Sequence, residues 1–337
     1  MSPGEGCVAV LGAGAWGTTL AWMLAREGRT VRLWARRAEL AAELANRREN
    51  RDYLPGTLLP DRVRVTADLG EALGGASAAI VAIPSHGLRA ITGHAASSME
   101  AGCLVVCATK GLELATGRRM SEVLQETLGA RRPRLVALSG PNLSGEIAAS
   151  MPAVSVAASD DPDAALAAQE LLSNSLFRVY TNPDIIGVEF CGAMKNVIAL
   201  GAGISDGLGY GANAKAALLT RGMAEIRRLG LRHGALESTF SGIAGIGDLI
   251  ATCSSPLSRN WTVGHRLGQG ESPEEIRNSM RNVAEGIGTA AAAMTQAQAA
   301  GVEIPITAGV YRVLYEGSAP ADEVRTLMAR RWRAEED

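Results

Sequence analysis

Eight short apolar runs alternate with helical patterns over residues 1–185, and no such run follows them. Val, Ile, Leu and Ala occupy both faces of most runs, and segments with helical apolar spacing, such as 16–27, 37–48 and 118–128, lie between them. Strands that are apolar on both faces and are joined by helices form a doubly wound, mainly parallel sheet. We predict strands over residues 7–12, 30–35, 63–66, 78–84, 103–109, 134–140, 153–159 and 177–182.

The rest of the chain has only helical patterns. One helix start is well marked, because Ser272 and Glu275 form a capping box with Pro273 at the first helical position. A chain of 337 residues is also too long for one ordinary core. We therefore predict a Rossmann-like α/β domain over residues 1–187 and an all-α domain over residues 188–337. The second domain's helices are expected near 187–206, 212–230, 235–252, 260–268, 273–281, 284–300, 306–316 and 320–334, and the proline-bounded segment 52–60 is expected to be a loop or an excursion.

Composition argues against several classes of protein. The formal net charge of −2 gives no basic field for nucleic acid. The five cysteines are scattered and none forms a CxxC pair, which favours reduced thiols in a cytosolic protein and no metal site. No apolar run is expected to reach the roughly 18–20 residues of a membrane span, and the segment "MSPGEG" has no signal-peptide core. We expect a cytoplasmic protein without a membrane span.

Residues 12–17 read Gly-Ala-Gly-Ala-Trp-Gly, directly after the first predicted strand and at the start of a helix. In that context Gly12 permits a tight turn, Gly14 lets the backbone approach a pyrophosphate, and Gly17 lets helix and strand pack closely. The pattern therefore predicts a dinucleotide site.

The second predicted strand ends in Ala35-Arg36-Arg37, where an NAD-specific site would have an Asp or a Glu. A carboxylate repels a 2′-phosphate, whereas a guanidinium can bind one. Arg36 and Arg37 therefore permit NADP(H) and favour it, unless they are an ordinary solvated pair.

Only three of the 33 Lys and Arg residues are lysines, namely Lys110, Lys195 and Lys215. Arg cannot easily exchange a proton, whereas the pKa of Lys falls on burial, so a chain this rich in Arg should keep Lys where a permanent charge fails. Lys195 lies on a helix face of small residues, and Lys110 follows the fifth predicted strand, at the edge where such sheets bind ligands. The alternatives are a snorkelling Lys195 and a surface charge at Lys110. Lys215 is expected to be an exposed helical lysine.

Two later segments place polar residues in chemically informative positions. Asp248 lies among apolar residues and needs a partner if it is buried, and Lys195 is the expected one. Residues 258–260, Ser-Arg-Asn, open a predicted helix with a hydroxyl, a guanidinium and backbone N–H groups, which together suit a phosphate. A plain N-cap is the alternative for Ser258, and a cap or helix-dipole role is the alternative for Glu285.

These segments together resemble the bacterial type of the NAD(P)-dependent glycerol-3-phosphate dehydrogenase family. The matching motifs run over nearly the whole chain: "GAGAWGT", "YLPG", "ATKGLE", "LSGPN", the long block 187–222, "GIAGIGDLIATCSSPLSRN" and "VAEG". The resemblance implies a fold like that of 6-phosphogluconate dehydrogenase. It also implies reversible reduction of dihydroxyacetone phosphate to sn-glycerol 3-phosphate by NADP(H) or NAD(H), for phospholipid synthesis, without a metal and in a homodimer.

The resemblance further implies a role for each matching residue. Lys195 would be the general acid/base that gives a proton to the C2 oxygen while hydride arrives at C2. Asp248 would support Lys195, and Arg259 would bind the substrate phosphate. The implied substrate-binding residues are Lys110, Gly140, Asn142, Lys195, Asn196, Asp248, Thr252, Ser258, Arg259 and Asn260, and the implied cofactor-binding residues are Gly12, Gly14, Ala15, Trp16, Gly17, Arg36, Arg37, Lys110, Ser144, Arg259, Val283 and Glu285.

Three residues depart from the bacterial pattern. Ala15 replaces a usual Ser and removes a hydroxyl from the glycine loop, Asn142 resembles the eukaryotic branch, and Ser144 replaces Ala and adds a polar group near the cofactor. Two other hypotheses stay open: a dehydrogenase of the same architecture acting on another oxo or hydroxy acid, and a catalytically silent nucleotide-binding protein. The Ser-Arg-Asn segment argues against the first, and the retained Lys195 argues against the second.

Overall fold

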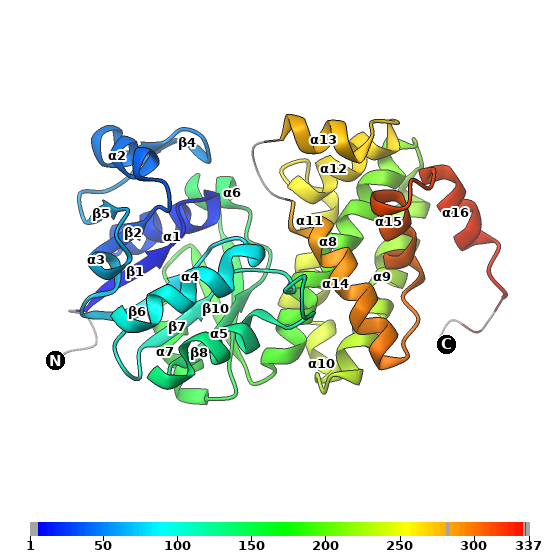
Figure 1. The fold of residues 1–337 in the computed structure, drawn as a ribbon. Helices are drawn as coiled ribbons and strands as arrows, with labels where there is room; N and C mark the ends of the chain where they lie inside the picture. The colour runs from blue at the N-terminus through cyan, green and yellow to red at the C-terminus, as the bar shows by residue number, and fades with distance from the viewer. Residues whose placement is uncertain (1–5, 281–283, 333, 335–337) are drawn as a thin grey trace.

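An α/β domain lies beside a helical domain, as Figure 1 shows. The computed structural model describes residues 6–280, 284–332 and 334. All ten strands precede Asp184, and every element from Ile185 onward is helical in the part of the chain that is described. The predicted order of an α/β domain followed by an all-α domain is therefore confirmed.

The eight predicted strands form one sheet in the order β10-β9-β8-β7-β6-β1-β2-β5. Neighbouring strands are parallel except β8 and β9, which are antiparallel. The strand order reverses between β1 and β6, and such a switch point opens a crevice at the carboxyl ends of the strands. The strands are β1 (Cys7–Leu11), β2 (Val31–Trp34), β5 (Val63–Thr66), β6 (Ala76–Val81), β7 (Leu104–Cys107), β8 (Arg134–Ser139), β9 (Ala153–Ala158) and β10 (Phe177–Asn182).

Helices cover both faces of this sheet. Alternate residues of a strand point to opposite faces, so Val8 and Val10 of β1 enter one buried cluster, and Ala9 and Leu11 enter the other. This explains why the strands read as apolar on both faces. Helices α1 (Ala15–Arg26), α2 (Ala38–Arg47), α6 (Ser144–Ala148) and α7 (Pro162–Leu172) supply the first cluster, and α3 (Leu69–Leu73), α4 (Leu88–Ala95) and α5 (Met120–Leu128) supply the second.

The segment predicted as a loop or an excursion contains a strand of a two-stranded antiparallel ribbon, β3 (Glu49–Asn50) with β4 (Leu54–Leu58). The Glu49 carboxylate accepts from the Gly56 N–H at 2.9 Å and closes the ribbon. The buried Asn50 amide donates to the Ala13 carbonyl at 2.9 Å and to Thr18 Oγ1 at 2.7 Å. These contacts fix the ribbon to the glycine loop before α1.

The helical domain is built around α8 (Ile185–Gly207), which packs against α9, α11, α12 and α14. The predicted boundary at residue 187 falls within the first turn of α8 and stays a prediction. The other helices are α9 (Ala212–Arg232), α10 (Glu237–Phe240), α11 (Asp248–Ser254), α12 (Arg259–Gly268), α13 (Pro273–Ser279), α14 (Glu285–Ala300), α15 (Pro305–Tyr315) and α16 (Pro320–Met328).

The single helix predicted over 235–252 is wrong, because a π-helical segment, η4 (Ile243–Gly247), separates α10 from α11. Gly245 within it has φ −88° and ψ −108°, and a Cβ there would lie 2.2 Å from the Phe240 carbonyl oxygen. The chain therefore needs glycine at this kink, and the kink sets where α11 and its first residue, Asp248, begin.

The core helix α8 is long and apolar enough to cross a membrane, with a mean hydropathy of 1.5 in its most apolar window, contrary to the prediction of no such run. Yet 89% of that window is buried inside the protein, which is typical of the core helix of a soluble protein. Glycines let α12 cross it closely. A Cβ on Gly203 would lie 2.1 Å from the Trp261 carbonyl oxygen, and one on Gly264 would lie 2.0 Å from that of Leu200.

Candidate active site

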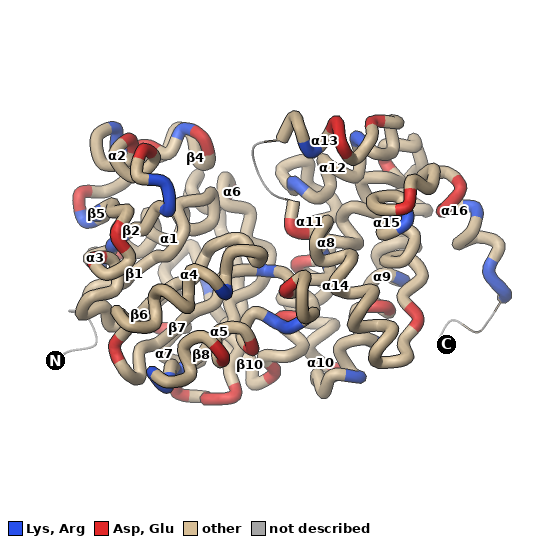
Figure 2. The backbone as a smooth tube through the Cα atoms, in the orientation of Figure 1, with Lys and Arg blue, Asp and Glu red and all other residues tan. Residues whose placement is uncertain are grey.

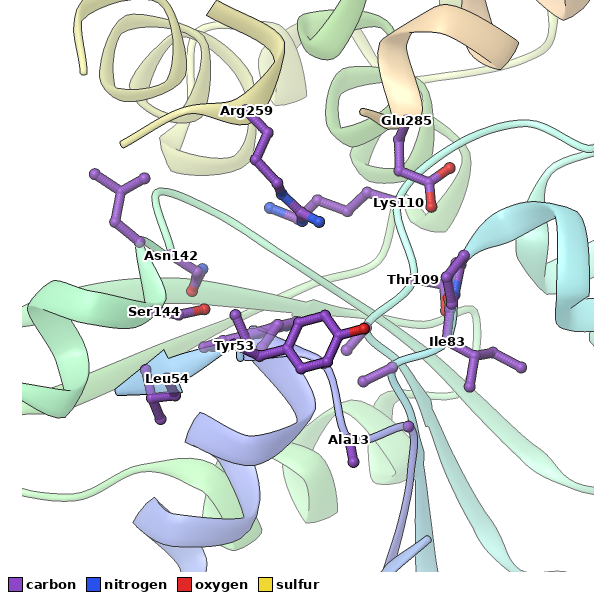
Figure 3. Close-up of a pocket in the computed structure, with 18 of the residues that line it drawn as sticks. Ala13, Tyr53, Leu54, Ile83, Thr109, Lys110, Asn142, Ser144, Arg259 and Glu285 are labelled. Carbon is purple, nitrogen blue, oxygen red and sulfur yellow. The ribbon is translucent and has the colours of Figure 1, made fainter. Parts of the chain in front are cut away.

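A cavity of about 910 Å³ is lined by residues of both domains. Its walls include the glycine loop after β1, the residues after β2 and β7, and α8 and the start of α12. Figure 3 shows Arg259 and Glu285 reaching into it from the helical domain, opposite Tyr53 and Ala13 of the α/β domain, and Figure 2 shows the charged residues along the two domains. The cavity thus lies at the carboxyl ends of the strands, where open α/β sheets bind ligands.

The glycine loop has the shape that a dinucleotide requires. Gly12 has φ +118°, and a Cβ there would lie 2.5 Å from the Ala82 carbonyl oxygen. A Cβ on Gly17 would lie 1.9 Å from the Gly12 carbonyl oxygen, so helix and loop pack in backbone contact. Nothing lies within 4 Å of a Cβ built on Gly14, which is the N-cap of α1 and has no side-chain cap. An open helix N-terminus of this kind suits a pyrophosphate.

Arg36 and Arg37 follow β2, are exposed and line the same cavity. The position after β2 is the buried Ala35, so no carboxylate stands there. Neither guanidinium has a hydrogen bond or an ion pair within the described residues. The two arginines therefore lie where a ribose 2′-phosphate could be bound.

Lys195 of α8, Asp248 of α11 and Lys110, which follows β7, form a charged centre. Asp248 is fully buried, its Oδ1 accepts from Lys195 Nζ, and its Oδ2 accepts from Lys110 Nζ at 2.9 Å. Lys195 Nζ also donates to Thr252 Oγ1 at 2.9 Å, and Lys110 Nζ donates to the Gly140 carbonyl at 2.9 Å. Lys195 is the partner expected for Asp248, while the second lysine on the same carboxylate was not expected.

The small-residue face of α8 makes room for this centre. A Cβ on Gly192 would lie 2.7 Å from Ser139 Oγ, which is 3.5 Å from Asp248 Oδ2. Glycine at position 192 therefore lets the end of β8 come close to the carboxylate that holds both lysines.

The charges of the centre are set by burial and by one another. Burial, and to a smaller extent the positive charge of Lys110, lower the pKa of Lys195 to about 7, against the attraction of Asp248. Burial alone would raise the pKa of Asp248, but the two lysines outweigh burial and hold that pKa below its usual range. The carboxylate thus stays ionised at neutral pH, while Lys195 can gain or lose a proton.

The Ser-Arg-Asn segment lines the cavity at the start of α12. Ser258 is the N-cap of α12, since its Oγ accepts from the Trp261 N–H at 3.3 Å, and the same residue also lines the cavity. Asn260 Nδ2 donates to Asn196 Oδ1 at 2.9 Å, which ties α12 to α8 beside Lys195. The Arg259 side chain has no hydrogen bond or ion pair among the described residues.

Glu285 is the first residue of α14 and contacts the other domain. Its Oε1 accepts from the Ser85 N–H at 3.1 Å, and its Oε2 accepts from Ser85 Oγ at 2.5 Å. Glu285 lies at the start of a helix, as the cap or dipole alternative expected. Its carboxylate, however, accepts hydrogen bonds from Ser85 of the α/β domain.

The remaining predicted residues divide into three groups. Ala15, Trp16, Asn142 and Ser144 line the cavity; the indole N–H of Trp16 and Oδ1 of Asn142 have no partner in the described chain. Asp248, Gly17 and Gly140 do not line the cavity but contact residues that do. Val283 lies outside the described residues. No cluster of three or more potential metal-ligating His, Cys, Asp or Glu side chains occurs in the portion described.

Comparison with known proteins gives the family. Residues 7–165 match the family described as the NAD-dependent glycerol-3-phosphate dehydrogenase N-terminus. Residues 184–325 match the family described as the C-terminus of the same enzyme. The chain belongs to the NAD-dependent glycerol-3-phosphate dehydrogenase family. The predicted family and oxidoreductase class are thereby confirmed. The enzyme of this family from Geobacillus thermodenitrificans is 47% identical over 324 residues, which are 96% of this chain and 94% of that protein.

Solved structures agree with the assignment to the glycerol-3-phosphate dehydrogenases. The enzyme from Coxiella burnetii superimposes with a TM-score of 0.93 at 36% identity, covering 97% of this chain and 99% of that one. A ketopantoate reductase from Ralstonia eutropha has a TM-score of 0.59 at 16% identity, over 94% of this chain and 99% of that one, and so shares the fold alone. The predicted two-domain fold is confirmed by these similarities.

Sequence reasoning missed two residues of this glycerol-3-phosphate dehydrogenase family member, one that lines the cavity and one that binds a residue lining it. Tyr53 lies on the ribbon and lines the cavity, and an aromatic residue beside the Pro55-Gly56 turn was the available signal. Ser85 binds Glu285 across 200 positions of sequence, and no local pattern indicates that contact.

Proposed function

We propose that this chain catalyses the reversible reduction of dihydroxyacetone phosphate to sn-glycerol 3-phosphate with NADPH or NADH. The observation that carries the proposal is the buried Lys195 with a pKa of about 7, on the wall of the cavity that also contains the glycine loop. An ammonium with that pKa can act as general acid in reduction and, as the neutral amine, as general base in oxidation. An arginine could do neither.

The residues of the glycine loop fit a nicotinamide dinucleotide. The uncapped start of α1 and the open space over Gly14 suit the pyrophosphate, and Arg36 and Arg37 suit a 2′-phosphate, which favours NADPH over NADH. When bound, the cofactor supplies the hydride that reduces C2. The chain's own part is to orient the substrate and to supply the proton to the C2 oxygen.

The charge of the cavity suits a phosphate-bearing substrate. Lys110, Lys195 and Arg259 bring three positive charges when Lys195 is protonated, and Arg36 and Arg37 add two. Asp248 and Glu285 bring two negative charges, so three positive charges are left uncompensated. Arg259 has no protein partner in the described residues, and its guanidinium reaches into the cavity. We assign it, with Ser258 and Asn260, to the substrate phosphate.

Asp248, Thr252 and Asn196 position the general acid. Asp248 holds the Lys195 ammonium from one side, and Thr252 Oγ1 accepts from it at 2.9 Å, so two of its three donors are fixed and one is left for the substrate oxygen. Asn196 follows Lys195 in α8 and accepts a hydrogen bond from Asn260. It therefore connects the general acid to the segment assigned to the substrate phosphate.

The wider role follows from the proposed reaction. We infer that the product supplies glycerophospholipid synthesis, that the enzyme works in the cytoplasm as a homodimer, and that no metal takes part. The reaction class is supported by the relatives, whose names describe glycerol-3-phosphate dehydrogenases that use NAD(P)+.

Lys195→Arg tests the function directly. We expect NADPH consumption with dihydroxyacetone phosphate to fall by about 10²-fold or more, with NADPH binding kept, because Arg keeps the charge and cannot give up the proton. Lys215→Arg is the matched control, since Lys215, which is half-buried rather than exposed as expected, pairs with Asp206 at 2.6 Å outside the cavity. Near-normal turnover of the Lys195 variant would refute the assignment. Wild-type protein that binds NADPH but reduces neither this substrate nor a panel of oxo acids would be a silent binding protein.

A further inference from the structure

A contact between Ser85 and Glu285 joins the two domains beside the cavity, in addition to the Lys110–Asp248 contact. Ser85 begins the short helix η1 (Ser85–Gly87) of the α/β domain, and its N–H and hydroxyl engage both carboxylate oxygens of Glu285. Gly111, at φ +149°, lies against this pair: a Cβ there would be 3.0 Å from Ser85 Cβ and 3.4 Å from Glu285 Oε2. Glycine at position 111 therefore leaves space for the contact.

Arg259 is a group that could compete for the same carboxylate, since the charge of Glu285 acts on it. Arg259 and Glu285 are the first residues of α12 and α14, they line one cavity, and both side chains enter it from the helical domain (Figure 3). Desolvation by the cavity walls lowers the pKa of Arg259, and the negative charge of Glu285 raises it, so the carboxylate acts on the guanidinium without bonding to it. A guanidinium and a carboxylate left free in such a cleft form a charge-assisted pair.

We propose that Ser85 is a positioning residue that holds Glu285 away from Arg259 and so keeps the guanidinium available for the substrate phosphate. Ser85 gives each carboxylate oxygen one donor, which replaces the hydrogen bonds that Arg259 would otherwise offer. Since Ser85 belongs to one domain and Arg259 to the other, the phosphate site is complete only when the domains are in contact. The inference rests on the proposed use of a phosphate-bearing substrate.

The test measures phosphate binding apart from turnover. Inorganic phosphate is titrated by calorimetry into wild type, Ser85→Ala, Ser85→Thr, Glu285→Gln and the Ser85→Ala/Glu285→Gln double variant, each with NADP+ present. We expect Ser85→Ala to weaken phosphate binding roughly five- to tenfold, because Glu285 keeps only the bond from the backbone N–H of residue 85 and its Oε2 can then pair with Arg259. Ser85→Thr keeps the hydroxyl, so its phosphate binding should stay close to that of the wild type. In the Glu285→Gln background, Ser85→Ala should change binding less than about twofold, since a neutral amide does not neutralise the guanidinium.

In the kinetic assay, Ser85→Ala should raise KM for dihydroxyacetone phosphate by the same factor and leave kcat nearly unchanged. Ser97→Ala is the control, because Ser97 is an exposed serine of the same domain outside the cavity. The inference is overturned if Ser85→Ala leaves phosphate binding unchanged, or weakens it equally with and without the Glu285→Gln substitution. Wild-type protein that binds phosphate through this network but does not reduce dihydroxyacetone phosphate would overturn the proposed function alone.

Discussion

Asp248→Asn removes the one negative charge that two lysines of the active site share. Asn keeps the size of the side chain, so the change is mainly electrostatic. Two unit charges 4 Å apart attract by about 4 kcal/mol at an effective dielectric constant of about 20, and one pH unit in a pKa corresponds to about 1.4 kcal/mol. The pKa of Lys195 should therefore fall by at least about one pH unit and at most about three, and repulsion from Lys110 acts in the same direction.

The direction of the rate change follows from the proposed role of Lys195 as general acid. Reduction needs the protonated amine, and a pKa of about 7 leaves about half of it protonated at pH 7 in the wild type. A pKa lower by about one pH unit leaves roughly a tenth protonated, so kcat for reduction at pH 7 should fall at least about fivefold. The limb of the rate–pH profile on which activity is lost with rising pH should move to lower pH.

The assay is NADPH consumption at saturating dihydroxyacetone phosphate from about pH 5 to about pH 9. Removing one partner of a buried ion pair costs about 3–5 kcal/mol of folding free energy, so the folded fraction is measured first by a thermal melt and by NADPH titration. Asp206→Asn is the control, because Asp206 also binds a lysine, Lys215, outside the cavity. A folded Asp248 variant whose limb stays at the wild-type pH would refute this account of the charged centre.

Two further predictions concern the cofactor. Arg36→Asp should raise the dissociation constant of NADPH more than that of NADH, because a carboxylate there repels the 2′-phosphate; equal changes in both titrations would rule out the proposed contact. Gly17→Ala should weaken NADPH binding at least about tenfold and lower the melting temperature, since its Cβ would lie 1.9 Å from the Gly12 carbonyl oxygen. Gly93→Ala, where nothing lies within 4 Å of the new Cβ, should change neither, and a similar loss in both variants would contradict the packing argument.

The sequence predicted the sheet well because each strand carries its own signal. A strand buried on both faces must be apolar throughout, as most of the eight runs are, and all eight runs became strands of one sheet. The helical domain was predicted less accurately where a helix changes its winding. Apolar spacing over 235–252 is much the same for one helix as for α10, η4 and α11, whereas the close contact that forces the kink at Gly245 is tertiary.

The site was predictable in its residue types and less so in its pairings. A buried Asp248 needs a cation, and the rarity of lysine indicated Lys195, so this pair followed from the sequence. That Lys110 binds the same carboxylate depends on how the end of β7 meets α11 across the domains. The Ser85–Glu285 contact likewise depends on domain packing, because each residue alone has an ordinary local explanation.

Burial is the main cause of the low pKa of Lys195, and the second lysine adds to it although a carboxylate binds both. A buried lysine paired one-to-one with a carboxylate is held protonated by that partner, and its attraction opposes the effect of burial. Here Asp248 is shared, so its attraction is divided between two cations that also repel each other. Lys110 thereby strengthens the ionisation of Asp248 and weakens the hold on the Lys195 proton at the same time. An arginine at position 195 would keep its proton in either arrangement, which is a physical reason for lysine in a chain that otherwise prefers arginine.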